Sequence, residues 1–169
     1  WYIHERIERI MTNQAKFDEF KSEVVGFATT VVMPIMRTFN DINWSSELPS
    51  MGVRSQTYRA TIMDGHHATS FKRLEDGLKA SNTTALELET LIDACIRNLE
   101  RVAKMIDHVR HDVNEIPECA YFKETPMYAT MEDLGVASVD ALTKAEGLKW
   151  TIQIVADLTR PHNHQVTLN

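Results

Sequence analysis

Apolar residues recur every three to four positions over residues 85–116, which is the period of an α-helix. Thr84 and Glu87 have the spacing of a capping box, in which each side chain accepts a hydrogen bond from an N–H of the first turn. Pro117 lacks the N–H that a continuing helix needs. The pattern therefore predicts one helix over residues 84–116, with a single apolar stripe turned to the core. The stripe consists of Ala85, Leu88, Ile92, Cys95, Leu99, Val102, Ile106, Val109, Val113 and Ile116.

The first half of the chain predicts two further helical regions separated by a loop. The first runs from about residue 3 to residue 43, with apolar residues on all sides from Val24 onward. Pro34 should kink or end this helix. Residues 44–53 contain Ser, Pro and Gly and predict a loop, after which a second helical region covers roughly residues 54–80. Phe71, Leu74 and Leu78 mark its apolar face.

The last part of the chain predicts an irregular segment, a helix and a tail. Residues 117–137 contain two prolines and a glycine and are expected to be irregular. A final helix is predicted to begin with Ser138 as N-cap and to end near Thr159. The domain prediction is a helical bundle over residues 1–159, followed by a loose tail at 160–169.

Four helical regions with apolar faces must cover one another's faces. The economical all-α arrangement is an antiparallel four-helix bundle with two long helices, the first and the third. The long helices would span ~45–60 Å at 1.5 Å per residue, whereas the second and fourth look shorter. Part of the long helices is then left uncovered, which favours self-association.

Composition and charge agree with a globular protein. Of the 169 residues, 43% are apolar and 25% charged, which excludes a disordered chain. The net charge is −6, and residues 85–169 carry the whole excess, with eight basic and fourteen acidic side chains. An acidic surface repels phosphate groups, so binding to nucleic acid or to an anionic membrane is disfavoured.

Cysteine usage and hydropathy bear on the compartment. Two cysteines, Cys95 and Cys119, do not make a disulfide framework, and Cys95 falls on the apolar stripe. The longest apolar stretch, Val24 to Met36, is too short to cross a bilayer, which takes about 20 residues. A cytoplasmic location is the simpler expectation. The first residue is Trp1, not methionine, so the extracytoplasmic part of a membrane-anchored protein stays open as an alternative.

The histidines are the main candidates for metal chemistry. His111-Asp112 resembles the doublet of the HD-type metal-dependent phosphohydrolases, and with it His67 and Asp157 would be ligands. The apolar lead-in and the following glycine of that family are absent. His108 and His111 are expected to point to water, because the valines beside them lie on the core stripe. We therefore predict no resident cofactor, with His67, His108, His111 and Asp112 as the group that would hold a divalent metal.

Ligand binding has candidates around the second helical region. Arg54 and Arg59 could bind an anion, and His66 and His67 follow the Asp64-Gly65 interruption of that region. The sequence contains no Glu-x-x-His of a di-iron bundle, no Gly-rich phosphate loop and no Gly-x-Ser-x-Gly elbow. An enzyme is therefore the less favoured class.

Three hypotheses for function follow. The first is a non-enzymatic helical interaction or assembly module that self-associates through incompletely covered apolar helix faces, with a second copy or another protein as partner. The second is the helical ligand-binding (sensor) domain of a receptor, which binds a small molecule between helices. The third is a metal-dependent enzyme that uses a His/Asp cluster.

Overall fold

The computed structural model describes residues 2–42 and 67–159, and all regular structure within these ranges is helical. The elements are α1 (Tyr2–Phe27), the π-helical η1 (Ala28–Val32), α2 (Met33–Asp41), α5 (His67–Lys79), α6 (Ala85–Glu115), the 3₁₀-helical η4 (Pro117–Glu124) and α7 (Pro126–Thr159). The all-α fold class is therefore confirmed.

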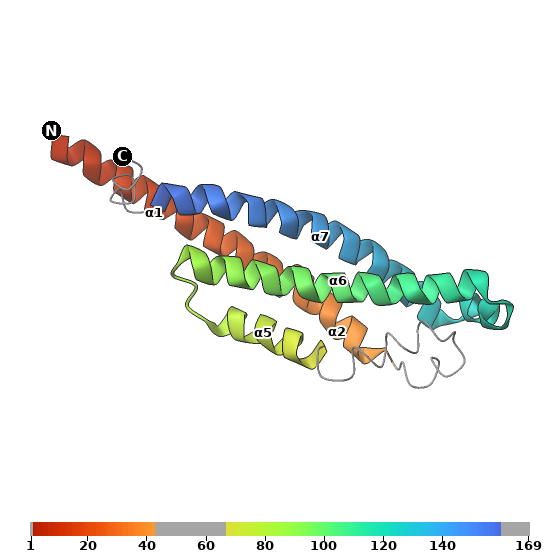
Figure 1. Cartoon of the computed structure of the whole chain (residues 1–169). Helices are drawn as coiled ribbons and strands as arrows, with labels where there is room; N and C mark the ends of the chain where they lie inside the picture. The colour runs from red at the N-terminus through yellow and green to blue at the C-terminus, as the bar shows by residue number, and fades with distance from the viewer. Residues whose placement is uncertain (1, 43–66, 160–169) are drawn as a thin grey trace, which may run out of the picture.

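Figure 1 shows how these helices lie beside one another. α6 and α7 run antiparallel along most of their lengths, and η4 connects them at one end. α5 packs against α6 through a short turn, and α1 lies along α7 (Figure 1). The first turns of α1 extend past the end of α7, so α1 is covered over only part of its length (Figure 1).

The prediction for α6 is confirmed at both ends. The Thr84 hydroxyl oxygen accepts a 3.1 Å hydrogen bond from the backbone N–H of Glu87. The Glu87 carboxylate accepts from the backbone N–H of Asn82 and from the Thr84 hydroxyl, each at 3.2 Å. α6 ends at Glu115, and Pro117 begins the next element. The stripe is buried from Leu88 to Val113, with its two end members half-buried.

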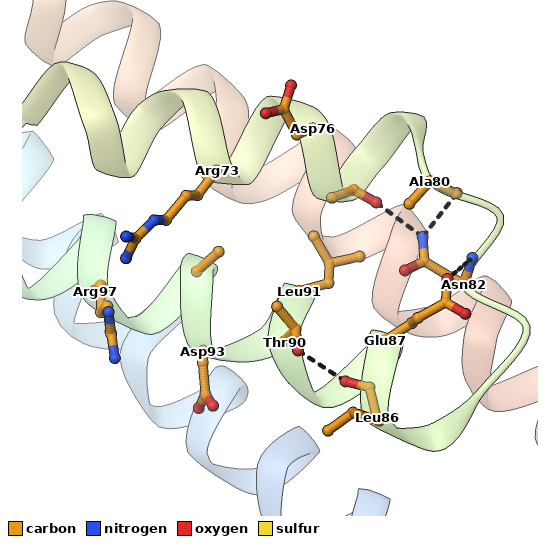
Figure 2. A pocket seen from close by; sticks show the side chains of 12 residues that line it. Arg73, Asp76, Ala80, Asn82, Leu86, Glu87, Thr90, Leu91, Asp93 and Arg97 are labelled. Atoms are coloured by element: carbon orange, nitrogen blue, oxygen red, sulfur yellow. Dashed lines mark hydrogen bonds between the residues drawn. The ribbon is translucent and has the colours of Figure 1, made fainter.

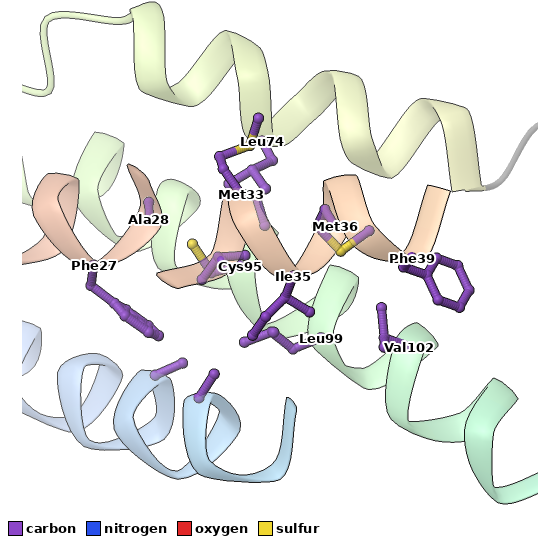
Figure 3. Close-up of a cluster of buried hydrophobic side chains, with 14 of the residues drawn as sticks. Phe27, Ala28, Met33, Ile35, Met36, Phe39, Leu74, Cys95, Leu99 and Val102 are labelled. Carbon is purple, nitrogen blue, oxygen red and sulfur yellow. The ribbon is translucent and has the colours of Figure 1, made fainter. Parts of the chain in front are cut away.

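The core lies between the facing sides of α1, α2, α5, α6 and α7. Figure 3 shows its centre, where Met33, Met36 and Leu74 converge between α2 and α5. Ile35 turns toward the α6 and α7 side of the same cluster. The flexible methionine side chains fill the irregular space between these helices.

Pro34 does not end the first helical region. The chain remains helical through Pro34 but widens just before it, because the N–H of Met33 donates to the carbonyl of Ala28, five residues back. Proline has no backbone N–H to donate within a helix, and a π-helical turn of this kind lets the helix continue past it. The chain is therefore helical from Tyr2 to Asp41, and buried residues continue along it as far as Phe39.

The prediction of an irregular segment over residues 117–137 is wrong, and so is the start of the last helix at Ser138. α7 begins at Pro126, and Ser138 is fully buried in its middle. Gly135 does not break the helix. It faces α6 at a point where a side chain would be crowded. A Cβ atom there would lie 2.7 Å from Nη2 of Arg110 and 3.3 Å from Cγ2 of Ile106.

The second helical region is confirmed for its described part. α5 covers residues 67–79, and Leu74 is fully buried with Phe71 and Leu78 half-buried beside it. The predicted loop at 44–53, the beginning of this region at 54–66 and the tail at 160–169 lie outside the described residues.

Candidate functional site

The helix α7 carries apolar side chains on two opposite faces. Its inner face packs against the rest of the molecule and is buried. The inner residues are Met131, Leu134, Ala141, Ala145, Leu148 and Ile152. A second row of residues, also spaced by three to four positions, lies on the opposite side of α7 and points away from the core. We call this row the α7 outer face: Val136, Val139, Thr143, Gly147, Trp150 and Ile154.

The large side chains of the α7 outer face are exposed to solvent. The exposed fractions are 61% for Val136, 56% for Val139, 69% for Trp150 and 47% for Ile154. The middle of the row carries little side-chain bulk, because Gly147 has no side chain. A Cβ atom added there would meet no other atom within 4 Å. A helix of a soluble protein normally shows one apolar stripe, so a second exposed stripe points to a covering partner.

Ion pairs hold α7 against its neighbours on both sides of this row. Lys144 donates to Glu23 of α1 at 2.8 Å, and Lys149 lies 2.9 Å from Asp93 of α6. The hydrogen bond with Asp93 raises the pKa of Lys149 above its ordinary value. These partly exposed ion pairs link α7 to α1 and to α6 on the two sides of the outer face.

A third ion pair ties the beginning of α7 to α6. Nε of Arg110 donates to Oε1 of Glu132 at 2.7 Å, and Nη2 donates to the second carboxylate oxygen at 3.3 Å. This fork-shaped contact lowers the pKa of Glu132 and raises that of Arg110.

A groove between α5 and α6 is one concave candidate site among the described residues. It encloses about 700 Å³, and Figure 2 shows the side chains that line it. Arg73 and Arg97 lie toward one end, and Asn82 and Glu87 toward the other (Figure 2). Leu91 forms part of the apolar wall between the ends (Figure 2).

The Asn82 side chain closes the far end of this groove. Its amide nitrogen donates to the carbonyl oxygens of Gly77 and Ala80, at 2.9 and 3.1 Å. Its φ of 50° is the left-handed conformation in which asparagine ends helices well. Its amide oxygen is buried and accepts no hydrogen bond from the described part of the chain. Asn82 therefore shapes the α5–α6 turn.

A second groove of about 650 Å³ runs between η1 and α7, next to the α7 outer face. Phe27, Val31 and Ala141 supply apolar walls, and the Glu23–Lys144 ion pair lies at its edge. Val31, a wall residue of this groove, is 39% exposed.

The predicted histidine and arginine sites are only partly within the described residues. Arg54, Arg59 and His66 lie outside them, and His67 is the first residue of α5, with a side chain that is not described. The ligand-binding prediction for these four positions stays a prediction.

The His111-Asp112 doublet does not form one solvent-facing pair. His111 is exposed, as expected, whereas His108, which was also expected to point to water, is half-buried. Asp112, the other residue of the doublet, is buried, at 1% exposed. No group of three or more His, Cys, Asp or Glu side chains that could hold a metal ion occurs in residues 2–42 and 67–159, as far as their side chains are described.

Both cysteines are buried and do not form a disulfide. Burial raises the pKa of the Cys95 thiol to about 12. A thiol with this pKa stays protonated at neutral pH and is a poor nucleophile.

Sequence reasoning missed the α7 outer face and both grooves. The four large residues of the outer face are apolar in the sequence, but the expected irregular segment separated Val136 from the helix that contains Trp150. Placing all four on one helix would have revealed the row. The grooves depend on how helices distant in sequence pack, and nothing in the local pattern marks them.

Comparisons with protein-family models, with curated proteins and with solved structures return no match. Among the described residues, no helix is long and apolar enough to cross a membrane.

Proposed function

We propose that this chain is a non-enzymatic helical assembly module that self-associates through the α7 outer face. The observation that carries the proposal is the exposure of Trp150 and Ile154 in one row with Val136 and Val139. Tryptophan is among the residues most enriched in binding hot spots, and a 69% exposed indole has little to gain from water. The proposal includes the antiparallel four-helix bundle as the scaffold that holds α7 in place.

The extent of the apolar surface supports a functional contact. The four large side chains together expose roughly 400 Å², given their exposed fractions and the size of aromatic and branched side chains. Summed over the four side chains, this area lies within the range of the largest apolar patch on a typical monomer, with Thr143 and Gly147 between its two halves. At about 25 cal/mol per Å², its burial in two copies supplies an upper limit of about 20 kcal/mol before the costs of association.

The net charge predicts how salt affects this contact, and the effect differs from that on a contact held by ion pairs. Two copies of a chain with net charge −6 repel each other at low ionic strength. Salt screens this repulsion and leaves the burial of apolar surface intact. We therefore expect the dissociation constant of the assembly to fall as salt rises, whereas an assembly held by ion pairs would weaken.

Sedimentation velocity on the purified chain over a range of concentrations and salt tests the proposal. We expect a concentration-dependent assembly that Trp150→Glu abolishes. The matched control is Leu86→Glu, because Leu86 is also exposed, at 74%, but belongs to α6 and is not part of the α7 outer face. A chain that stays monomeric at all concentrations, or equal losses in the two variants, would count against the proposal.

The groove between α5 and α6 favours one second candidate, a ligand-binding domain. Its volume of about 700 Å³ falls in the range of small-molecule sites, and its lining combines apolar residues such as Leu91 with charged ones such as Arg73 and Arg97. Thermal-shift screening with small organic acids and bases tests it. Thr90→Trp, a change in the groove wall, should abolish a true shift. A shift that survives this change would argue against the groove.

The third hypothesis, a metal-dependent enzyme, gains no support from the described residues, because His108, His111 and Asp112 do not converge with other ligands there.

A further inference from the structure

The α7 outer face is nearly symmetric about its middle. Apolar side chains occupy both ends, and two smaller residues lie between them. In order the face reads Val136, Val139, Thr143, Gly147, Trp150 and Ile154. Residue 145 is the midpoint between 136 and 154, and the midpoint between 139 and 150 falls within one residue of it. A face with this symmetry matches a copy of itself turned end for end.

We propose that the α7 outer face pairs with the same face of a second copy, with the two α7 helices antiparallel about a two-fold axis beside residues 143–147. This inference rests on the proposed function and adds the partner and the direction. It places Val139 opposite Trp150 of the second copy, and Val136 opposite Ile154 of the second copy. Thr143 lies opposite Gly147 of the second copy, and the two-fold axis repeats each contact.

The side-chain volumes favour this direction over a parallel pair. A parallel pair would set Trp150 against Trp150 and, one turn away, Gly147 against Gly147. The two helices would then need very different separations at neighbouring layers, which leaves voids or strain. The antiparallel pair sets the largest side chain, Trp150, against the smaller Val139. Its narrow layers lie at the centre and its wide layers at both ends, as two crossing helices require.

The helix ends favour the same direction. Two long α7 helices side by side in antiparallel order place the positive end of one helix dipole near the negative end of the other. A parallel pair would place like ends together.

The buried area fits a second copy of this chain. The row from Val136 to Ile154 is about 27 Å long. Two copies bury roughly 800 Å² from the four large side chains alone. Exposed neighbours such as Glu146 and Gln153 bring the total toward the ~1,200 Å² at which specific interfaces begin.

Cysteine cross-linking on the full chain tests the direction. Three variants carry one new cysteine each: Val136→Cys, Ile154→Cys and Thr143→Cys. The native Cys95 and Cys119 are buried and should stay unreactive in the folded chain. In an antiparallel pair of two Val136→Cys chains, the two introduced thiols are about 27 Å apart along the helix, too far for a disulfide. Mixing Val136→Cys with Ile154→Cys should instead give a disulfide-linked heterodimer under mild oxidation.

The remaining variants separate a wrong direction from a wrong function. Thr143→Cys lies near the axis and should cross-link with a short bismaleimide in any pairing through this face. Leu86→Cys is the exposed control outside the face and should not cross-link.

Two results would overturn the direction while self-association stands: disulfide dimers of Val136→Cys alone, or cross-linked Thr143→Cys without a mixed heterodimer. Thr143→Cys that does not cross-link, in a chain that sediments as a monomer, would overturn the proposed function as well.

Discussion

Two substitutions on α7, two residues apart, should differ greatly in their effect on the stability of the monomer. Ile152 is 1% exposed on the inner face, and Trp150 is 69% exposed on the outer face. Ile152→Ala removes three buried carbon atoms, about 2.4 kcal/mol of transfer free energy at about 0.8 kcal/mol each. The cavity left behind raises the expected loss of unfolding free energy to about 3 kcal/mol. Trp150→Ala removes a larger side chain but should change the free energy of unfolding by less than about 0.5 kcal/mol.

Urea denaturation followed by far-UV circular dichroism measures both differences. The chain must be kept dilute, because assembly adds to the apparent stability of the folded state. In thermal melts, the loss for Ile152→Ala corresponds to a fall in Tm of about 6–12 °C for a chain of this length. A loss for Trp150→Ala in dilute solution as large as that for Ile152→Ala would refute the two-faced description of α7.

Further predictions concern the cysteine, the ion pair and the glycines. Cys95, with a pKa of about 12 from burial, should not react with a thiol reagent at pH 8 in the folded chain and should react fully in urea, as mass spectrometry can show. The lowered pKa of Glu132 means that its pair with Arg110 stabilises the fold above the unfolded-state pKa and that this contribution is lost as pH falls through the folded-state pKa. Acid titration should therefore show Glu132→Gln less stable than the parent chain at pH 7 by less than about 1 kcal/mol, with the difference vanishing as pH falls below the folded-state pKa of Glu132. Gly147→Ala should stabilise the dilute monomer by about 1 kcal/mol in urea melts, because the added methyl meets open space and alanine favours the helix. Gly135→Ala should gain little or nothing, because the methyl displaces Arg110 from its pair.

The helix α6 could be predicted from sequence because local signals settle it. An unbroken apolar period, the Thr84 cap and Pro117 all act within one segment and agree with one another. Burial of the stripe followed directly from that period.

α7 could not be predicted to its full length, because tertiary packing overrides its local signals. Gly135 normally weakens a helix, but here it allows α7 to approach Arg110 and Ile106 of α6. Ser138 is a good N-cap by composition, and it lies buried in mid-helix instead.

The place of the exposed apolar row could not be predicted from the sequence. Partly uncovered apolar helix faces were expected on the long first and third helices, whereas the exposed row lies on α7. The burial of Asp112 depends on the helices around it, which the local sequence does not specify.

The fluorescence of Trp150 as the sole tryptophan reports whether a second copy covers the α7 outer face. Replacing Trp1 and Trp44 with phenylalanine leaves one indole, on the α7 outer face. In dilute solution we predict the red-shifted emission and rapid acrylamide quenching of a solvated indole. Above the dissociation constant, the emission should shift to the blue and quenching should slow as the second copy covers the face. An indole that is already shielded in dilute solution, or one that stays fully quenchable at every concentration, would contradict the account.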